Sequence, residues 1–139
     1  MTNKTYIGDT CTQKMQLSIA DIAAGATALG DINPIHFSHE EALIAGYPGI
    51  IASGAHTAGL CGGALTRKFQ HSGAFMGLDC SYRFHRAVLP NEELTITWTT
   101  VRIEHKMKLK GSIAFFEGKM TDSENRTLIS STMQVLLKD

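Results

Sequence analysis

The sequence predicts an α+β fold in which one long helix packs inside a curved antiparallel sheet. Three observations support this prediction. Helical patterns with capping residues occupy the first half of the 139-residue chain, whereas strand patterns fill the second half from Gly73 onward. The helix between these halves is unusually rich in glycine and alanine, and small side chains allow a strand to approach a helix closely. At this length we expect residues 1–139 to form a single domain.

The first elements are a predicted strand and a predicted helix. Residues Thr10–Leu17 alternate between two faces, a pattern that is typical of a half-buried strand. Ser18 with Asp21 three positions later resembles a capping box, in which a serine and an acidic residue satisfy each other's backbone N–H groups. We therefore expect a helix over Ile19–Leu29, and Gly30 ends it because glycine tolerates the left-handed backbone of a helix terminus.

A second short helix is predicted after a loop. Ser38 and Glu41 have the spacing of a full capping box, so a helix is expected to run from there to about Ala45 and to end at Gly46. The stretch Ile32–Phe37 then lies between two helices. We expect it to be a loop, the kind of segment that often displays functional side chains.

The remaining elements are a third helix and four strands. The helix is predicted from Ser53 to about Phe69, although each interior glycine costs roughly 1 kcal/mol relative to alanine. That cost is tolerable where small residues let a strand backbone come close. Turn residues at Pro90-Asn91 and over 122–126 separate the later strands. These strands are expected over Ala74–Phe84, Leu94–Glu104, Lys108–Thr121 and Leu128–Leu137.

The composition argues against several classes of function. Thirteen Lys and Arg residues balance thirteen Asp and Glu residues, and no basic stripe is present, so neither nucleic acid nor an anionic membrane is expected as a partner. Apolar stretches end well before the ~20 residues that cross a bilayer, and the N-terminus lacks the apolar run of a signal peptide. Cys11, Cys61 and Cys80 follow no metal-binding spacing, so we expect reduced thiols in a soluble cytoplasmic protein.

Asp31 and His36 are the leading candidates for catalytic residues. An Asn33-Pro34 turn lies between them, and proline restricts both its own backbone and that of the preceding residue. The two side chains can therefore converge on one small object. A carboxylate accepts hydrogen bonds and an imidazole can donate or accept, so the pair can orient and deprotonate a water molecule. The alternative is structural, with Asp31 capping a turn and His36 on the surface.

The segment Asp31-Ile32-Asn33-Pro34-Ile35-His36, followed by Ala42, resembles the signature of the MaoC-like (R)-specific enoyl-CoA hydratases. The resemblance extends along nearly the whole chain, through Ile7-Gly8-Asp9, Ser53-Gly54 and Ser81-Tyr82-Arg83-Phe84. It implies a hot-dog fold, with Asp31 and His36 holding the catalytic water. The sequence departs from the family where Ser53-Gly54-Ala55 replaces a common His-Gly-Met and Gly59 replaces a serine. This departure affects the expected acyl pocket.

The resemblance implies a hydro-lyase that reversibly hydrates a trans-2-enoyl thioester to an (R)-3-hydroxyacyl thioester. The substrate would be carried on coenzyme A or on an acyl carrier protein, with no cofactor and no metal, and the protein is expected to form a homodimer through its sheet edges. Ser53 is expected to cap the third helix, so that the Gly54 N–H is free to bind the thioester oxygen. Asn33, also a candidate contact, is expected to fix the turn.

Two other functions stay open at this stage. Thioester hydrolysis on the same fold could use Asp31 as base or nucleophile, because fold alone does not determine chemistry. A non-catalytic acyl-binding module is the second alternative, although such a module has no need for a water-activating pair. The His36-x-x-His39 spacing is a weak metal motif without a third ligand. Three basic residues, Lys68, Arg83 and Arg86, are candidates to contact coenzyme A phosphates.

Overall fold

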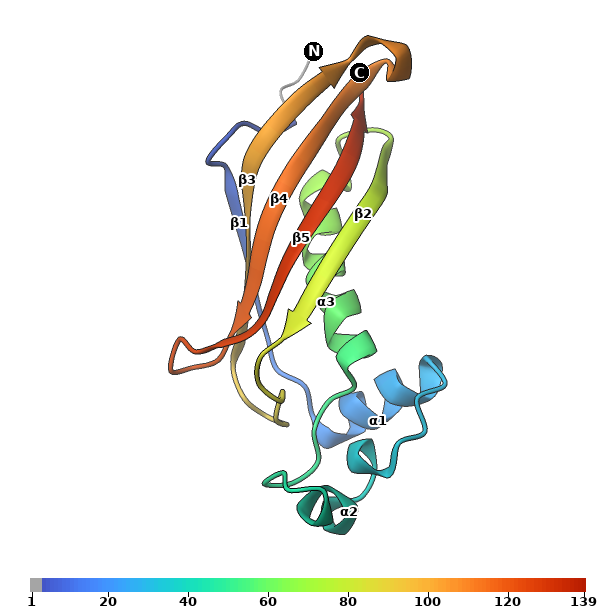
Figure 1. Ribbon diagram of the computed structural model, residues 1–139, viewed down its shortest axis with the longest axis vertical. Coiled ribbons are helices and arrows are strands. Elements are labelled where there is room, and N and C mark those ends of the chain that lie inside the picture. The colour runs from blue at the N-terminus through green and yellow to red at the C-terminus, as the bar shows by residue number, and fades with distance from the viewer. Residues whose placement is uncertain (1–3) are drawn as a thin grey trace.

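One long helix lies against a five-stranded antiparallel sheet in the computed structural model, which describes residues 4–139 (Figure 1). The helix, α3, spans Gly54–Phe69, and the strand order across the sheet is β1-β3-β4-β5-β2. The α+β prediction is confirmed. The strands are β1 Thr10–Met15, β2 Phe75–Phe84, β3 Leu94–Lys106, β4 Gly111–Thr121 and β5 Thr127–Lys138.

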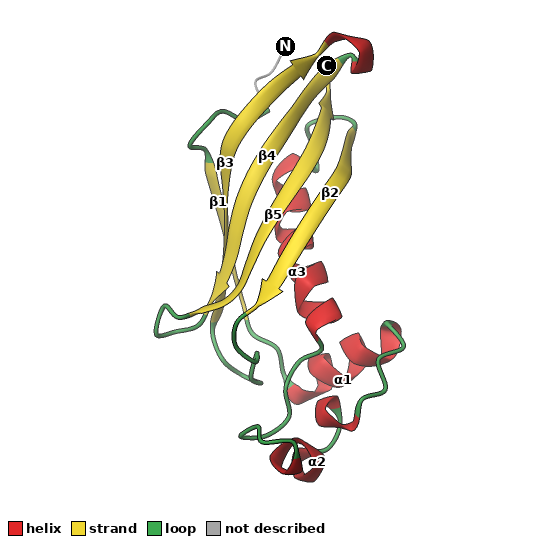
Figure 2. Ribbon diagram, viewed as in Figure 1, coloured by secondary structure: helices red, strands yellow, loops and turns green. Residues whose placement is uncertain are grey.

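Two short helices and a 3-10 turn gather at one end of the sheet, beside the N-terminus of α3 (Figure 2). They are α1 Ile19–Ala28, the turn η1 Pro34–His36 and α2 His39–Ile44. The predicted capping box of α1 is confirmed, because the Ser18 hydroxyl accepts from the Asp21 N–H at 3.0 Å and the Asp21 carboxylate accepts from the Ser18 N–H at 2.9 Å. The Ser38 hydroxyl caps α2 at 3.2 Å.

The core lies between α3 and the concave face of the sheet. Trp98 of β3 is buried there, and its indole N–H donates to the Cys61 carbonyl of α3 at 2.8 Å. Phe69 at the other end of α3 packs against Phe75 and Phe116, with ring centroids 5.9 Å and 5.8 Å away. Aromatic side chains bury large apolar areas, so these contacts help to hold the helix on the sheet.

The glycines of α3 do not all serve the close strand approach that the sequence predicted. A Cβ added at Gly54 or Gly62 would meet the side chains of Phe84 and Tyr82 on β2, at 3.2 Å from the nearest atom in each case. Gly59, by contrast, has open space beside it. The helix therefore accommodates two β2 side chains, and no strand backbone lies against these glycines.

Two further predictions are corrected by the structure. The stretch Ile32–Phe37 contains the 3-10 turn η1, which the Asn-Pro pair initiates. The strand predicted from Lys108 begins at Gly111, because a 3-10 turn over Met107–Leu109 and a left-handed Lys110 (φ 50°) reverse the chain. Met107 lies in this turn and is 82% exposed.

Candidate active site

Asp31 and His36 lie in contact. The His36 Nε2 is 3.0 Å from the Asp31 Oδ2, and His36 is buried whereas Asp31 is partly exposed. Local structure fixes both residues. Gly30 adopts a left-handed backbone (φ 71°) after α1, and the next residue donates its N–H to the Ala26 carbonyl at 2.9 Å. His36 ends the turn η1, so the five-residue spacing places the two side chains face to face.

The His36 ring is oriented from its other side by Ile51. The Nδ1 atom lies 2.8 Å from the Ile51 carbonyl oxygen in the segment that precedes α3. A carbonyl oxygen only accepts hydrogen bonds, so the Nδ1 carries a proton and donates it. The Nε2 then faces the Asp31 carboxylate, and this contact is favourable only when one more proton lies between the two atoms.

The Asp31 carboxylate receives two further hydrogen bonds. The Ser53 hydroxyl donates to Oδ2 at 2.6 Å, and the Asn33 N–H donates to Oδ1 at 3.2 Å. These donors, with Ser53 first, and the neighbouring His36 hold the pKa of Asp31 below its usual value. Asp31 is therefore the anionic member of the pair.

Ser53 occupies the predicted N-cap position of α3, but its side chain makes no capping hydrogen bond. The residue is fully buried, and its hydroxyl donates to Asp31 instead. The backbone N–H groups of the first turn of α3 therefore donate no hydrogen bond to this side chain. A helix start of this kind carries a partial positive charge.

Asn33, the third non-catalytic candidate, is exposed, and its side chain is used within its own turn. The Asn33 Oδ1 accepts from the Ile35 N–H at 3.4 Å, as an Asx residue at the start of a turn does. Among the contacts of the described residues, it is the backbone N–H of Asn33 that reaches the pair, through Asp31. The geometry therefore places Asn33 as a turn-forming residue.

A cavity of about 330 Å³ lies at the N-terminus of α3, and neither Asp31 nor His36 is among its lining residues. Gly54 and Ile51 line it from the α3 side, and Phe84 and Arg86 line it from the end of β2 and the segment that follows. Ile51 belongs to both features, because its carbonyl oxygen holds His36. The cavity wall combines apolar side chains, polar ones such as Arg86, and the start of a helix, whose first N–H groups have no partner within the helix. A mainly apolar wall with a few polar groups is the composition expected of a small-molecule site.

Sequence reasoning missed two contacts around this site. The Ile51 carbonyl and the Ser53 hydroxyl reach the pair from a segment that lies 15 and 22 positions further along the chain. No local sequence pattern predicts such contacts.

Lys68, a candidate for phosphate contact, instead forms an ion pair with Asp9 at 2.6 Å, with both side chains mostly buried.

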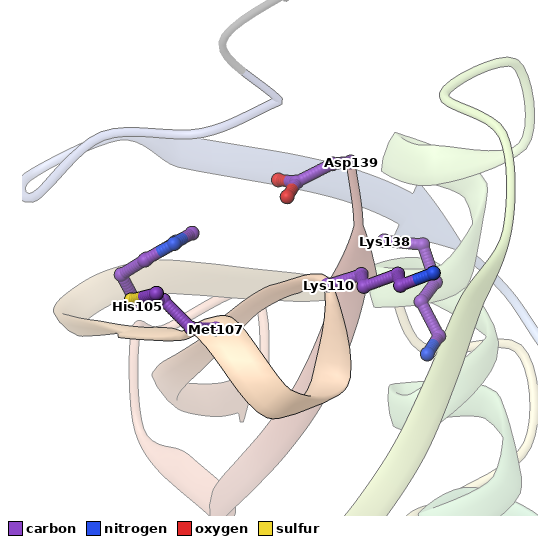
Figure 3. Close-up of a pocket in the computed structure, with 5 residues that line it drawn as sticks. All are labelled: His105, Met107, Lys110, Lys138 and Asp139. Atoms are coloured by element: carbon purple, nitrogen blue, oxygen red, sulfur yellow. The ribbon is translucent and has the colours of Figure 1, made fainter.

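A second cavity lies at the opposite end of the sheet (Figure 3). It has a volume of about 590 Å³, and it is lined by His105, Met107, Lys110, Lys138 and Asp139. The turn after β3 and the C-terminal end of β5 form it, so it is remote from the pair at the N-terminus of α3 (Figure 1). Although it is the larger hollow, its lining offers no counterpart to the Asp31 and His36 contact.

The architecture, a central helix against a five-stranded antiparallel sheet, defines the class of hot-dog proteins. The sequence matches the MaoC like domain over residues 3–116, and the chain belongs to this family of dehydratases and hydratases. No curated protein gives a significant match by sequence.

Solved structures support the fold assignment. A MaoC-like dehydratase from Rhodospirillum rubrum is 21% identical, with a TM-score of 0.85 over 99% of this chain and 95% of that one. An (R)-hydratase from A. caviae involved in PHA biosynthesis is 20% identical, with a TM-score of 0.86 over 98% of this chain and 99% of that one. A 3R-hydroxyacyl-ACP dehydratase complex, HadBC from Mycobacterium tuberculosis, is 18% identical, with a TM-score of 0.79 over 96% and 98%.

Two absences are established for residues 4–139. None of the helices described there is long and apolar enough to cross a membrane. In the same part of the chain, no group of three or more His, Cys, Asp or Glu side chains is placed to hold a metal ion, and His39 stands apart on the exposed first turn of α2.

Proposed function

We propose that this protein reversibly hydrates a trans-2-enoyl thioester to an (R)-3-hydroxyacyl thioester, carried on coenzyme A or on an acyl carrier protein. The observation that carries the proposal is the contact of Asp31 with His36, 3.0 Å apart. The pair is linked to the cavity at Gly54 through Ile51, which lines that cavity and whose carbonyl oxygen accepts from His36. Membership of the MaoC-like family and the dehydratase and hydratase structures support it. Asp31 and His36 are proposed as the catalytic residues.

Asp31 and His36 together can supply the base and the acid that hydration requires. Hydration requires a base to take a proton from water and an acid to give one to carbon. The Asp31 carboxylate is the base as the water oxygen attacks C3, and the His36 Nε2–H protonates C2. A proton then passes from Asp31 to His36 across the 3.0 Å contact and restores the starting state. Dehydration follows the same steps in reverse.

The start of α3 is proposed to stabilise the thioester oxygen. Negative charge develops on this oxygen during conjugate addition, and preorganised N–H donors at a helix start oppose it. Gly54 is the first residue of the 16-residue α3, and it lines the cavity. Its N–H has no carbonyl one turn earlier in the helix as a partner. Because Ser53 bonds to Asp31, no Ser53 side-chain cap competes for these donors.

The test is turnover by variants of the pair, measured as loss of enoyl absorbance. Asp31→Asn and His36→Ala are each expected to lower kcat by about 10²–10⁴-fold, the usual contribution of a general acid or base. The double variant should lose far less than the product, since both groups take part in one coupled proton transfer. His39→Ala is the matched control, because His39 is an exposed histidine three residues from His36.

The same experiment separates the rival functions. Release of free thiol from acyl-CoA, without loss of enoyl absorbance, would identify a thioesterase. Binding without turnover by the wild-type protein would identify an acyl-binding module. Near wild-type turnover by either Asp31→Asn or His36→Ala would remove the pair from the mechanism.

We also propose that two copies pair through β2. This strand is an edge of the sheet, so one side of its backbone lacks a neighbouring strand. It exposes large apolar side chains, with Met76 at 61%, Leu78 at 45% and Phe84 at 54%. A two-fold pairing would cover this surface and place the partner beside the cavity that Phe84 lines. Light scattering should then report about twice the 15.1 kDa chain mass, and a monomer that turns over substrate would contradict the pairing.

A further inference from the structure

The hydroxyl of Ser53 has an unusual partner for its place in the fold. A serine at an N-cap normally accepts a hydrogen bond from a backbone N–H one turn into its helix. Ser53 occupies that position at the start of α3, yet its hydroxyl donates at 2.6 Å to the carboxylate of Asp31, 22 positions earlier in the chain. The side chain is fully buried, so water does not replace this bond in the folded protein. The Ser53 side chain therefore makes a hydrogen bond to a charged group instead of capping α3.

Ser53 and His36 converge on the same oxygen atom. The Asp31 Oδ2 accepts from the Ser53 hydroxyl at 2.6 Å and lies 3.0 Å from the His36 Nε2. The other oxygen, Oδ1, accepts only the longer 3.2 Å bond from the Asn33 N–H among the contacts of the described residues. Oδ1 therefore retains capacity for a further proton donor, whereas Oδ2 is already engaged by two groups.

We propose that Ser53 is a positioning residue that fixes where the proton of the Asp31 and His36 pair resides. By donating to Oδ2, the hydroxyl favours the carboxylate anion over the carboxylic acid, and so keeps the proton on the His36 Nε2. It also directs Oδ1 toward the water that is to be deprotonated. This inference rests on the proposed function, because it assigns Ser53 a part in the same proton transfer.

The groups that act on the pKa of Asp31 are few, so the effect of Ser53 on it can be tested separately. From η1, the charged group that acts on Asp31 is His36, and the neighbouring turn contributes the neutral Asn33 N–H. From the start of α3 the contribution is the Ser53 hydroxyl, while His56 on the same helix interacts with Asp21 of α1. The Ser53 bond is the largest single influence on Asp31, and removing it should raise the pKa of that carboxyl.

Ser53→Ala, assayed as a pH profile of kcat, gives the kinetic test. We expect the acid limb of the profile to move to higher pH. On the acid side kcat should fall about tenfold, the size expected for loss of one hydrogen bond to a charged group. Ser53→Thr retains a hydroxyl and should restore the wild-type limb. Ser131→Ala is the matched control, because it removes a buried hydroxyl that bonds the Ser81 carbonyl in the sheet.

Carbon-13 NMR of the aspartate carboxyl groups gives a test that needs no turnover. The Asp31 signal, assigned by its absence in Asp31→Asn, should titrate at higher pH in Ser53→Ala than in the wild-type protein. An unshifted Asp31 titration would overturn the role of Ser53, as would an unshifted acid limb in an active Ser53→Ala enzyme. A shifted titration in a protein that hydrates no enoyl thioester would support the control of Asp31 by Ser53 and overturn the proposed function alone.

Discussion

Replacing Gly54 with proline deletes one backbone N–H from the first position of α3 and so tests the proposed oxyanion donor. The local backbone accepts this change. Ser53 has φ −63° and ψ 134°, the extended region that a residue before proline prefers. Proline is also common at the first helical position, where the N–H has no intrahelical partner. The substitution therefore removes a donor without breaking the helix.

A matched control is needed because any side chain at this position meets Phe84. A Cβ on Gly54 would lie 3.2 Å and 3.3 Å from two ring atoms of Phe84, so the half-exposed ring must shift by a few tenths of an ångström. Gly54→Ala adds the same Cβ and keeps the N–H. The difference between the proline and alanine variants therefore isolates the hydrogen-bond donor.

The expected loss is set by the usual value of one oxyanion donor. Gly54→Pro should lower kcat by roughly 10²–10³-fold relative to Gly54→Ala, which corresponds to about 2.7–4 kcal/mol of transition-state stabilisation, with a smaller change in KM. Initial rates of enoyl absorbance loss give kcat and KM, and circular dichroism with thermal unfolding confirms the fold of each variant. A folded Gly54→Pro enzyme with the kcat of Gly54→Ala would refute the assignment and would mean that the thioester oxygen is bound elsewhere.

The remaining predictions concern stability, measured by urea unfolding. Lys68→Met should destabilise the fold by about 2 kcal/mol, because it leaves the mostly buried Asp9 without its ion-pair partner. Burial raises the pKa of Asp9, but hydrogen bonds and charge from Lys68 and Thr5 outweigh burial and lower this pKa overall. The wild type therefore loses this stabilisation as pH falls through the folded pKa. The free energy of unfolding of the variant should depend less on pH in the acid range. Gly118→Ala should cost about 1–3 kcal/mol, because its Cβ would lie 2.4 Å from the Trp98 ring, whereas Gly59→Ala, with open space, should stabilise α3 by up to about 1 kcal/mol. Burial lowers the pKa of His56, and its buried Nδ1 has no partner among the described residues. The wild type should therefore lose stability as pH falls below about 6.5, the usual pKa of histidine. An equal dependence of the unfolding free energy on pH in the wild type and in His56→Leu would contradict this.

The sequence by itself determined the features that depend on neighbours along the chain. The capping box of Ser18 and Asp21 is encoded within one helical turn, and it formed as expected. Asp31 and His36 are brought close by the stiff turn between them, which Asn33 and Pro34 initiate. Alternation in the second half of the chain likewise specified strands, since each side chain needs only its own backbone to choose a face.

Tertiary structure decided whatever depends on segments far apart in sequence. The order β1-β3-β4-β5-β2 follows from non-local pairing, which no single strand encodes. The tertiary structure also decided the partner of Ser53. Local rules predict that this side chain caps the helix, but the fold brings the Asp31 carboxylate within 2.6 Å of its hydroxyl. A hydrogen bond to a charged group is stronger than one to a neutral backbone group. The same reason explains why Lys68, which the sequence offered as a candidate phosphate contact, is paired with Asp9. Where two groups compete for one side chain, the stronger electrostatic partner prevails once folding has placed it within reach.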